Sequence, residues 1–454
     1  MIQKFIVNGG NPLRGEVSLA GAKNSGFKLM IASLLSEEKS TLGNFSKIGD
    51  IVSTAKVIEE LGGKVTFKEN HEMFIEGSAI NKFELSEKHG RLSRASTYFV
   101  GPLLKRFGKA VITVPGGCKI GRRPLDRHLE GFAALGAIFN YDGEYCLIEA
   151  SELQGTKYRF TKNTHGGTDV MIIAAALAEG ETILENAAEE PEIDDLISFL
   201  NQMGAKIKRV AGRKIVIEGV KELKGTSFEV MPDRNEAVTF ACAALVTKGD
   251  ILVRKANPAV LTAFLEKITE IGGGYEILPD GIRFFYDRPL SSSHVITAPY
   301  PGFMTDWQAL WTILMTQTQG ISTIHETIFE NRFGFVGDLI KMGAKIDLYN
   351  PEVENPESFY NFNWADNKPE YFHAAKVFGP TTLTGNMMEI CDIRAGATLI
   401  LAALVAQGKT ELTGVEHVDR GYENLEERLR SLGARISRIE EQEFTSQPSP
   451  AMAE

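Results

Sequence analysis

Apolar and polar positions along the chain follow a pattern that repeats six times. In each repeat, a helix-like run ends in a large apolar residue and a glycine, and a strand-like run with alternating apolar and polar positions follows. Glycine at such a position favours the left-handed conformation that closes a helix. The pattern therefore predicts six helices that end, at intervals of 74, 68, 68, 71 and 90 residues, near Gly62, Gly136, Gly204, Gly272, Gly343 and Gly433.

A second helix-to-strand pattern alternates with the first. One copy, at residues 34–42, lacks a glycine, and the other five are centred on Gly108, Gly180, Gly249, Gly320 and Gly408. Each unit thus holds two helices and several strands, which is typical of an α/β module. Solenoid repeats are shorter, at about 20–45 residues, so we expect three units to pack into each of two similar domains. The boundary falls near residues 232–234, and a ligand site is expected in the cleft between the domains.

The last interval is longer than the others, and its extra residues lie within 349–388. This stretch is rich in asparagine, proline and aromatic residues, among them Phe359, Tyr360, Phe362 and Trp364. The simplest interpretation is a surface excursion that packs its own aromatic rings. A lid or an oligomer contact is the alternative.

Composition narrows the class of protein. The chain has 454 residues, 43% of them hydrophobic and 24% charged, with a formal net charge of -10. Nucleic-acid binders usually show a basic balance, so we expect no nucleic-acid partner. No apolar run approaches the roughly 20 residues that span a bilayer, and the N-terminus lacks the pattern of a secretory signal. Four widely separated cysteines indicate reduced thiols, so we expect a cytoplasmic protein without a membrane partner.

Residues 115–124 concentrate glycine, proline and basic side chains around one cysteine, Cys118. Glycine and proline at this density predict a loop. The neighbouring lysine and arginines favour the thiolate, so Cys118 is a candidate nucleophile or proton donor. Cys146, Cys242 and Cys391 lie in apolar runs and are expected in the core. The histidines show no metal-ligand spacing, and we expect neither a metal nor a cofactor.

Two glycine-containing segments are expected to begin helices. Residues 21–28 resemble a phosphate-binding P-loop, but Phe27 stands where the lysine belongs. What remains is Lys23 and Asn24 at a helix start, either an anion site or an ordinary beginning of a helix. In residues 299–308, a turn brings Asp306 to a helix that begins near Trp307, where it either caps the helix or acts as a general base.

Several arginines recur beside glycines at loop–helix junctions. Each alone is typical of a solvated surface, but their shared setting indicates a polyanionic ligand. They are Arg94, Arg332, Arg394 and Arg420.

At these segments the chain resembles the enolpyruvyl transferase family, and within it the branch that acts on UDP-N-acetylglucosamine. The resemblance extends over residues 3–440, apart from the expansion at 349–388. The 3-phosphoshikimate branch is not similar at the cysteine loop. The matching motifs begin at Gly21, Arg94, Pro115, Arg123, Glu190, Pro232, Thr305, Phe329, Asp392 and Asp419.

The resemblance implies a fold of two inside-out α/β domains, each made of three βαβαββ repeats, with the active site in the interdomain cleft. It places the first domain, which carries the cysteine loop as a lid, at 22–232. The second domain comprises 1–21 plus 233–442, with the insertion near 349–388, and 443–454 is expected to be a disordered tail. The oligomeric state is left open.

The resemblance also implies a reaction. Protonation of C3 of phosphoenolpyruvate makes C2 electrophilic, the 3-hydroxyl of UDP-N-acetylglucosamine attacks, and loss of a C3 proton and phosphate restores the vinyl group. In this scheme Cys118 transfers a proton and is the residue alkylated by fosfomycin, Asp306 accepts the hydroxyl proton, and Lys23 and Arg394 are also catalytic. Phosphoenolpyruvate is held by Lys23, Arg94, Arg123, Arg394 and Arg420.

The acceptor side departs most from the family pattern. The chain reads Thr164-His165-Gly166-Gly167-Thr168 where the family usually has Ser-Val-Gly-Ala-Thr, and Tyr300 and Met304 replace the usual His and Pro. Transfer to UMP or a similar uridine nucleotide, as in nucleoside-antibiotic synthesis, is therefore an alternative, and a non-catalytic sugar-nucleotide-binding protein is another. The residues expected to bind the sugar nucleotide are Asn24, Arg94, Arg123, Pro124, Leu125, Asp126, Arg127, Lys162, Thr164, His165, Gly166, Asp306 and Ile328.

Overall fold

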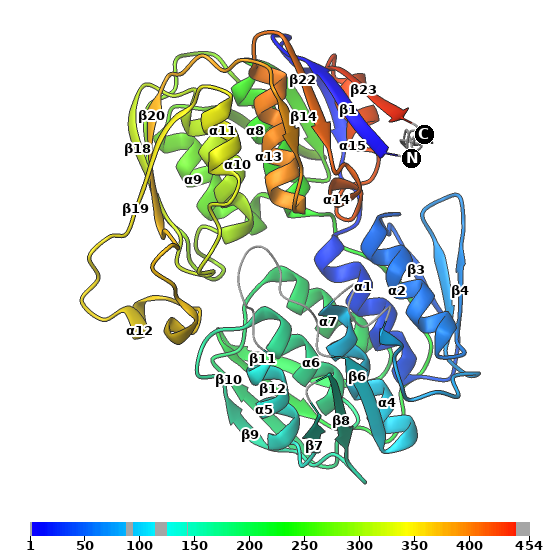
Figure 1. Cartoon of the computed structure of the whole chain (residues 1–454). Helices are drawn as coiled ribbons and strands as arrows, with labels where there is room; N and C mark the ends of the chain where they lie inside the picture. Colours follow the sequence, from blue (N-terminus) through cyan, green and yellow to red (C-terminus); the bar gives the residue numbers. More distant parts are fainter. Residues whose placement is uncertain (1, 88–93, 114–124, 143, 442–454) are drawn as a thin grey trace, which may run out of the picture.

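The chain folds, in a computed structural model, into two lobes (Figure 1). The structure describes residues 2–87, 94–113, 125–142 and 144–441. One hydrophobic core, that of the first lobe, draws its residues from Leu29 to Val230. The core of the second lobe combines Phe5 to Leu19 with residues from Ala237 onward. The predicted domain limits of 22–232 and 233–442 stay a prediction, and the tail 443–454 lies outside the described residues.

Six sheets share one strand arrangement, which accounts for the sequence repeat. In five of them a parallel pair is followed by two antiparallel pairs. The sixth, β6-β8-β7, has three strands, and a parallel bridge from Glu84 to Val111 lies where the fourth strand would be. One face of most strands is buried and the other faces solvent, as in β10 and β12.

The strands of the first lobe come from the sequence between residues 40 and 229. In sheet order they are β13 (Ser227–Glu229), β3 (Ser40–Gly43), β5 (Met73–Glu76) and β4 (Lys64–Phe67); β9 (Lys157–Arg159), β10 (Glu181–Glu185), β12 (Lys214–Glu218) and β11 (Lys206–Ala211); and β6 (Lys109–Thr113), β8 (Tyr145–Glu149) and β7 (Ile138–Tyr141).

The second lobe takes the first two strands of the chain into its sheets. Strand β1 lies between β22 and β23, and β2 pairs with β14. In sheet order the strands are β21 (Met387–Glu389), β22 (Lys409–Thr413), β1 (Ile2–Asn8) and β23 (Arg435–Glu441); β2 (Arg14–Ser18), β14 (Asp250–Arg254), β16 (Gly281–Phe285) and β15 (Gly274–Leu278); and β17 (His294–Ile296), β18 (Gly320–His325), β20 (Ala374–Gly379) and β19 (Lys345–Tyr349).

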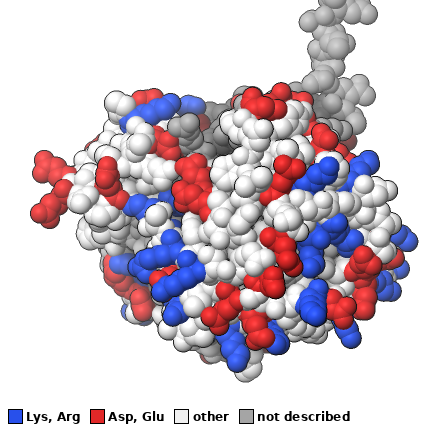
Figure 2. Space-filling model, turned by 90° about the horizontal axis from the view of Figure 1, so that it is seen from below, with Lys and Arg blue, Asp and Glu red and all other residues white. Residues whose placement is uncertain are grey.

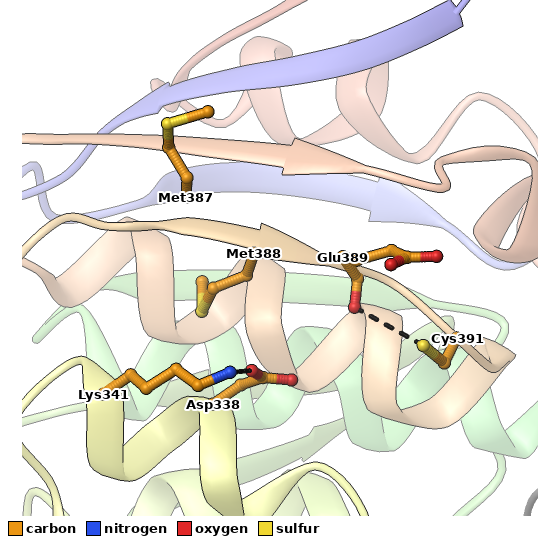
Figure 3. A pocket seen from close by; sticks show the side chains of 6 residues that line it. All are labelled: Asp338, Lys341, Met387, Met388, Glu389 and Cys391. Carbon is orange, nitrogen blue, oxygen red and sulfur yellow. Dashed lines mark hydrogen bonds and ion pairs between the residues drawn. The ribbon is translucent and has the colours of Figure 1, made fainter.

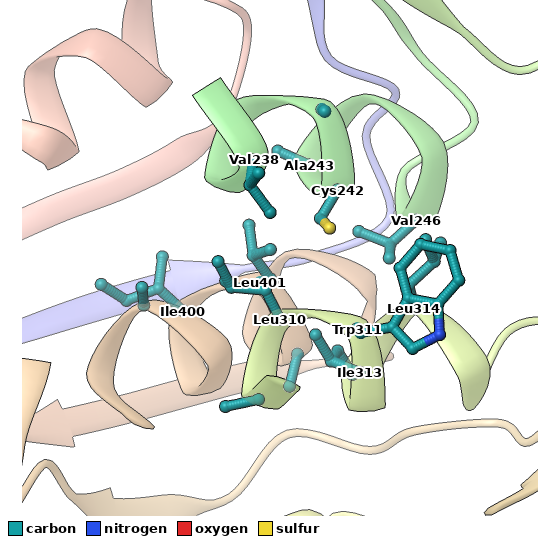
Figure 4. Packing of buried hydrophobic residues seen from close by; sticks show 14 of the residues in the cluster. Val238, Cys242, Ala243, Val246, Leu310, Trp311, Ile313, Leu314, Ile400 and Leu401 are labelled. Carbon is teal, nitrogen blue, oxygen red and sulfur yellow. The ribbon is translucent and has the colours of Figure 1, made fainter. Parts of the chain in front are cut away.

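Two classes of helix alternate along the chain. The inner helices are mostly apolar and buried, except for the last turn of α4, which carries Lys105 and Arg106. Helices α8, α10 and α13 pack on one another at the centre of the second lobe (Figure 4). The inner helices are α1 (Lys23–Ala32), α4 (Val100–Phe107), α6 (His165–Ala175), α8 (Arg234–Val246), α10 (Thr305–Met315) and α13 (Ile393–Val405).

The outer helices bury one face only. They are α2 (Gly49–Glu60), α5 (Asp126–Ala134), α7 (Pro191–Gln202), α9 (Thr262–Glu270), α11 (Val336–Lys341) and α15 (Leu425–Ser431). The described residues also form short helices, at α12 (Pro356–Phe359), α14 (Glu416–Asp419), η1 (Ser33–Leu35), η2 (Arg94–Phe99), η3 (Pro258–Val260) and η4 (Trp364–Asp366).

The helix ends confirm the glycine pattern with one exception. All six glycines of the first pattern have a positive φ, between 77° and 109°. In the second pattern, Gly108, Gly180, Gly320 and Gly408 do so too. The exception is Gly249, where the left-handed residue is Lys248, one position earlier. A side chain at Gly249 would meet the carbonyl oxygen of Leu13 at 2.0 Å, so glycine is needed there for close packing.

The chain crosses between the lobes twice, and the two crossings are hydrogen-bonded to each other. Ala22 donates its N–H to Met231, and Asp233 donates its N–H to Ala20. The Asp233 carboxylate then serves two helices: one oxygen accepts the N–H of Lys23, the first residue of α1, and the other accepts two N–H groups at the start of α8. Asp233 is 3% exposed. Asp233 is therefore the N-cap residue of α8 and also binds the first N–H group of α1, whose own N-cap residue is Ala22. We call this double contact the shared N-cap.

The long interval contains regular strands as well as an extra segment. Strands β20 and β21 belong to the repeat, so the addition is residues 350–373, between β19 and β20. The equivalent strand pairs β11–β12 and β15–β16 are joined by residues 212–213 and 279–280 alone. We call residues 350–373 the aromatic arm; it extends from the second lobe on the side where α12 is labelled (Figure 1).

The surface carries both signs of charge. Seen from below, basic and acidic side chains are interspersed among uncharged ones (Figure 2). Among the described residues, no helix is long and apolar enough to cross a membrane.

The shared cap predicts the effect of Asp233→Ala. Loss of both caps should lower the free energy of unfolding by about 2 kcal/mol, because one N-cap contributes about 0.5–2 kcal/mol. Asp233→Asn retains one acceptor oxygen and should lose less. Denaturant unfolding of the three proteins measures the difference, and equal losses for Ala and Asn would contradict the shared cap.

Candidate functional site

The inner helices begin where the two lobes meet, and their first turns carry polar side chains. Lys23 starts α1, His165 starts α6 and Arg234 starts α8, while Asp306 and Arg394 are the second residues of α10 and α13. The N-terminus of a helix carries a partial positive charge and unpaired N–H groups. The geometry therefore favours an anionic ligand at this junction.

Asp306 lies between two arginines. Its two carboxylate oxygens are 3.1 Å from Arg332 Nη2 and 3.4 Å from Arg394 Nη2. The N-cap of α10 is Met304, so the capping alternative for Asp306 is wrong. Burial alone would raise the pKa of Asp306, but Arg394, Arg332 and Lys23 together hold it well below its usual range. Asp306 is therefore ionised at neutral pH.

Arg394 is fixed from several sides. Asp392 accepts the N–H groups of Arg394 and Ala395 and so caps α13. Arg394 Nη1 donates to the Tyr422 hydroxyl at 3.0 Å, and that hydroxyl lies 2.8 Å from Thr239 Oγ1. A guanidinium in this setting cannot lose its proton and cannot easily move.

Lys23 and Arg420 share one carboxylate, that of Asp50 in α2. Lys23 Nζ is 3.0 Å from Asp50 Oδ2, and Arg420 Nε donates to Asp50 Oδ1 at 3.0 Å. Burial raises the pKa of Asp50, and the two cations more than offset this, so the pKa is lowered. Because Asp50 belongs to the first lobe and Arg420 to the second, this cluster joins the lobes beside the N-terminus of α1.

A buried ion pair lies next to these groups. Arg234 donates two hydrogen bonds to Glu192 of α7, at 3.0 and 2.9 Å, and the two side chains are 2% and 1% exposed. The Arg234 guanidinium lies 5.0 Å from the centre of the Tyr300 ring. Burial opposes ionisation of Glu192, but Arg234 lowers the pKa to about 2. The pair connects two motifs that lie 42 residues apart.

His165 is held within the first lobe. Its Nε2 lies 2.6 Å from Lys28 Nζ, and Lys28 also pairs with Asp169 at 2.6 Å. Burial, followed by the charge of Lys28, lowers the pKa of His165 well below its usual value, so the ring is neutral and accepts from the lysine. Burial raises the pKa of Asp169 to about 7 despite Lys28. His165, which was predicted to contact the nucleotide, is thus hydrogen-bonded to Lys28 within the first lobe.

The remaining acceptor-side residues lie around the starts of α5 and α6. Thr164 caps α6 by accepting the N–H of Gly167. A Cβ atom at Gly166 would lie 3.0 Å from His128 Nε2, so the His128 ring would have to shift to admit a side chain there. Ile328 donates its N–H to Glu326, which also accepts from Thr305, the neighbour of Asp306. Leu125 is the N-cap of α5, and Asp126 and Arg127 are the first two residues of that helix. Lys162 lies in the segment before α6, and Asn24 is the second residue of α1.

Some predicted residues are not placed by the structure. Cys118, Arg123 and Pro124 lie outside the described residues. Arg94 begins η2, and its side chain is likewise not described. Their proposed roles stay predictions.

One cysteine prediction is wrong. Cys146 and Cys242 are buried as expected, but Cys391 is half-buried and lines a surface pocket of about 440 Å³ (Figure 3). Its Sγ lies 3.7 Å from the carbonyl oxygen of Glu389. Cys391 stands just before the cap of α13, where the chain leaves strand β21, and this position accounts for its exposure. The other lining residues are Asp338, Lys341, Met387, Met388 and Glu389.

Among the described side chains, no group of three or more His, Cys, Asp or Glu could hold a metal ion.

Comparison with known proteins places the chain in a family. Residues 7–429 match EPSP synthase (3-phosphoshikimate 1-carboxyvinyltransferase). The chain belongs to this family of enolpyruvyl transferases. It is 40% identical over 440 residues to UDP-N-acetylglucosamine 1-carboxyvinyltransferase 3 of Caldanaerobacter subterraneus, an alignment that covers 97% of this chain and all of that one. It is 41% identical to UDP-N-acetylglucosamine 1-carboxyvinyltransferase of Trichlorobacter lovleyi, again over 97% of this chain and 100% of the relative.

Solved structures of the family share the fold. The enolpyruvyl transferase NikO from Streptomyces tendae superposes with a TM-score of 0.83 at 22% identity, covering 96% of this chain and 99% of that one. EPSP synthase from Acinetobacter baumannii gives a TM-score of 0.70 at 19% identity, covering 96% and 100%. The predicted inside-out α/β fold with six repeats is thereby confirmed.

Sequence reasoning missed Asp50 and the Glu192–Arg234 pair, and it did not connect Arg332 with Asp306. Asp50 looked like an ordinary acidic residue in the first turn of α2. Glu192 and Arg234 lay in motifs that were noted, but nothing in the sequence paired them. Arg332 was noted as a junction arginine, and a search for partners of Asp306 would have pointed to it.

The Glu192–Arg234 pair predicts a pH dependence of stability. Because the pKa of Glu192 in the folded protein lies below its ordinary 4.5, its contribution is present above that pH and is lost as pH falls toward about 2. Glu192→Gln should remove this component and lower stability by about 3–5 kcal/mol, since Arg234 stays buried without a charged partner.

The effect is measured as the denaturant midpoint at a series of pH values from about 7 down to about 3. Glu218→Gln is the matched control, because Glu218 pairs with Lys206 with both side chains about 60% exposed and should contribute little. Equal losses in the two variants would contradict the role of the buried pair.

Proposed function

We propose that this protein transfers the enolpyruvyl group of phosphoenolpyruvate to the 3-hydroxyl of UDP-N-acetylglucosamine and releases phosphate, the first committed step of peptidoglycan precursor synthesis, in the cytoplasm. The full-length relatives at 40% and 41% identity support this acceptor, because both carry that activity in their names. The observation that carries the chemistry is the position of Asp306 between Arg332 and Arg394, within electrostatic range of Lys23.

Phosphoenolpyruvate brings a phosphate and a carboxylate, and the junction offers cations for both. Lys23 and Arg420 share the single carboxylate of Asp50, so that cluster retains a net positive charge. In this proposal Lys23, Arg394 and Arg420 bind the donor anion, together with Arg94 and Arg123. Preorganised cations of this kind offset the charge that develops on the departing phosphate.

The depressed pKa of Asp306 has a consequence for its role as a base. A carboxylate held by two arginines is ionised but only weakly basic. When the donor anion occupies the same cations, part of their charge is offset, and the pKa of Asp306 rises toward that of a working base. In this scheme Asp306 takes the proton of the 3-hydroxyl while the hydroxyl oxygen bonds to C2 of phosphoenolpyruvate. Cys118 is assigned the proton delivered to C3 by family resemblance.

The test of the function is phosphate release from phosphoenolpyruvate with one acceptor at a time. We expect release with UDP-N-acetylglucosamine and little with UMP. Because catalysis by a positioned base contributes about 10²–10⁴-fold, Asp306→Asn should lower kcat by that factor. Asp338→Asn, which alters an exposed i,i+3 pair with Lys341 on α11, is the control and should retain turnover.

Release with UMP alone would reassign the acceptor. The absence of release with any uridine nucleotide would favour a sugar-nucleotide-binding protein without this activity.

A second prediction concerns pH. Arg332 and Arg394 both lower the pKa of Asp306, so Arg332→Gln should raise it. The acidic limb of the kcat/KM profile reports the ionisation of an essential base in the free enzyme. That limb should therefore move to higher pH in Arg332→Gln than in the unmodified protein. A limb that stays in place would indicate that Asp306 is not the group that titrates.

A further inference from the structure

The aromatic arm is a packed element. Tyr360, which is 1% exposed, stacks on Trp364 with ring centres 5.1 Å apart and planes 9° apart. Phe362 and His373 lie 4.9 Å from the same tyrosine ring. The Tyr360 hydroxyl lies 3.0 Å from Nε2 of His325, which belongs to β18 of the second lobe. The expected self-packing of the aromatic residues is confirmed, and the arm is anchored to its own lobe.

The arm also reaches the first lobe, which a simple surface excursion would not do. Asn361 makes three hydrogen bonds in three directions. Its N–H donates to Thr327 O at 2.7 Å in the second lobe, and its Nδ2 donates to Asn163 O at 2.9 Å in the first. Its carbonyl oxygen accepts from Arg127 Nη2 at 2.9 Å. Asn361 therefore joins the segment before α6 to the segment that carries Ile328.

Two cations of the first lobe are oriented by the arm. Arg127 also donates to Asn363 Oδ1 at 3.1 Å, and Lys162 Nζ donates to Tyr360 O at 2.7 Å and contacts Glu357 O. These acceptors are neutral carbonyl and amide oxygens, which fix a cation without cancelling its charge. The carboxylates of Asp126 and Glu357 add only longer-range attraction. Two like charges held close together in this way favour an anion between or beside them.

We propose that the aromatic arm forms one wall of the acceptor subsite and determines acceptor specificity, with Asn361 as its positioning residue. The arm would set Arg127 and Lys162 for the phosphate groups of a nucleotide and fix the spacing between residues 163 and 327. This inference rests on the proposed function, because the acceptor there is a uridine diphosphate sugar. The inference adds a determinant of acceptor specificity that lies in the aromatic arm, residues 350–373.

The first experiment is steady-state kinetics of Asn361→Leu, which removes the side-chain amide at nearly constant volume. Loss of one positioning hydrogen bond should raise KM for UDP-N-acetylglucosamine by about tenfold. KM for phosphoenolpyruvate should stay within about twofold, because Lys23 and Arg394 stand at the starts of α1 and α13, Arg420 follows α14, and none of the three bonds to Asn361. Asn386→Leu, at an exposed amide that bonds to Lys341 O, is the control and should change neither constant.

An unchanged KM for the acceptor, or an equal rise for both substrates, would overturn the proposal. A rise in KM for the acceptor alone indicates a positioning role. General destabilisation would instead lower the amount of active enzyme and leave both KM values unchanged.

A second measurement does not require turnover. The chain has three tryptophans, of which Trp307 and Trp311 are 1% and 0% exposed in the core, whereas Trp364 belongs to the arm. Titration with UDP-N-acetylglucosamine, and separately with uridine diphosphate, should change tryptophan emission in the unmodified protein and not in Trp364→Phe. Absence of a change with either ligand would overturn the arm assignment. A change without phosphate release would instead count against the proposed function and leave the arm as a nucleotide contact.

Discussion

The shared N-cap at Asp233 is the contact on which the rest of the site depends. Its carboxylate accepts backbone N–H groups from α1 and from α8, so the first turns of one helix from each lobe are fixed relative to each other. The first residues of those two helices are Lys23 and Arg234. One carboxylate thus places Lys23, which we propose binds the donor, and the arginine of the buried ion pair. Burial raises the pKa of Asp233, and Arg394 opposes this by attraction, so the cap is electrically coupled to the site as well.

The inside-out arrangement also explains why charged side chains are concentrated where the two lobes meet. Most residues of the inner helices are apolar, and the charged residues of α8, α10 and α13 stand in the first turn. Where Lys23, Asp306 and Arg394 stand, the helix also contributes its positive end. A chain with a net charge of -10 can still present a local cationic site. At the junction, four cations pair with only two carboxylates, those of Asp50 and Asp306; the cations are Lys23, Arg332, Arg394 and Arg420.

The repeat could be predicted well from the sequence, whereas the contacts between distant residues could not. Glycines such as Gly62 and Gly433 marked helix ends because only a residue tolerant of positive φ fits there, and this is a local property. Gly249 shows the limit, since its requirement comes from the carbonyl of Leu13, far away in the sequence. Partnerships such as Asp50 with Arg420, 370 residues apart, depend on how the lobes meet and leave no local pattern.

The same reasoning applies to Cys391 and to the aromatic arm. An apolar run suggested a core cysteine, but the run ends at the cap of α13, and the thiol lines a surface pocket. For the arm, composition was sufficient to predict self-packing of the rings. The bonds of Asn361 to Asn163 and Thr327 were not predictable, because two of the three partners are backbone carbonyls and carry no side-chain signal.

Relative motion of the lobes is constrained unequally around the site. The Glu192–Arg234 pair joins the lobes next to the second crossing, and breaking this buried pair would cost about 3–5 kcal/mol. The contact of Arg420 with Asp50 is more exposed and is easier to break. On the arm side, Asn361 and Lys162 bond to carbonyls across the junction, and these bonds must break together if the lobes separate there. The lobes are therefore held most firmly at the buried pair, and the arm adds a second set of hydrogen bonds across the junction.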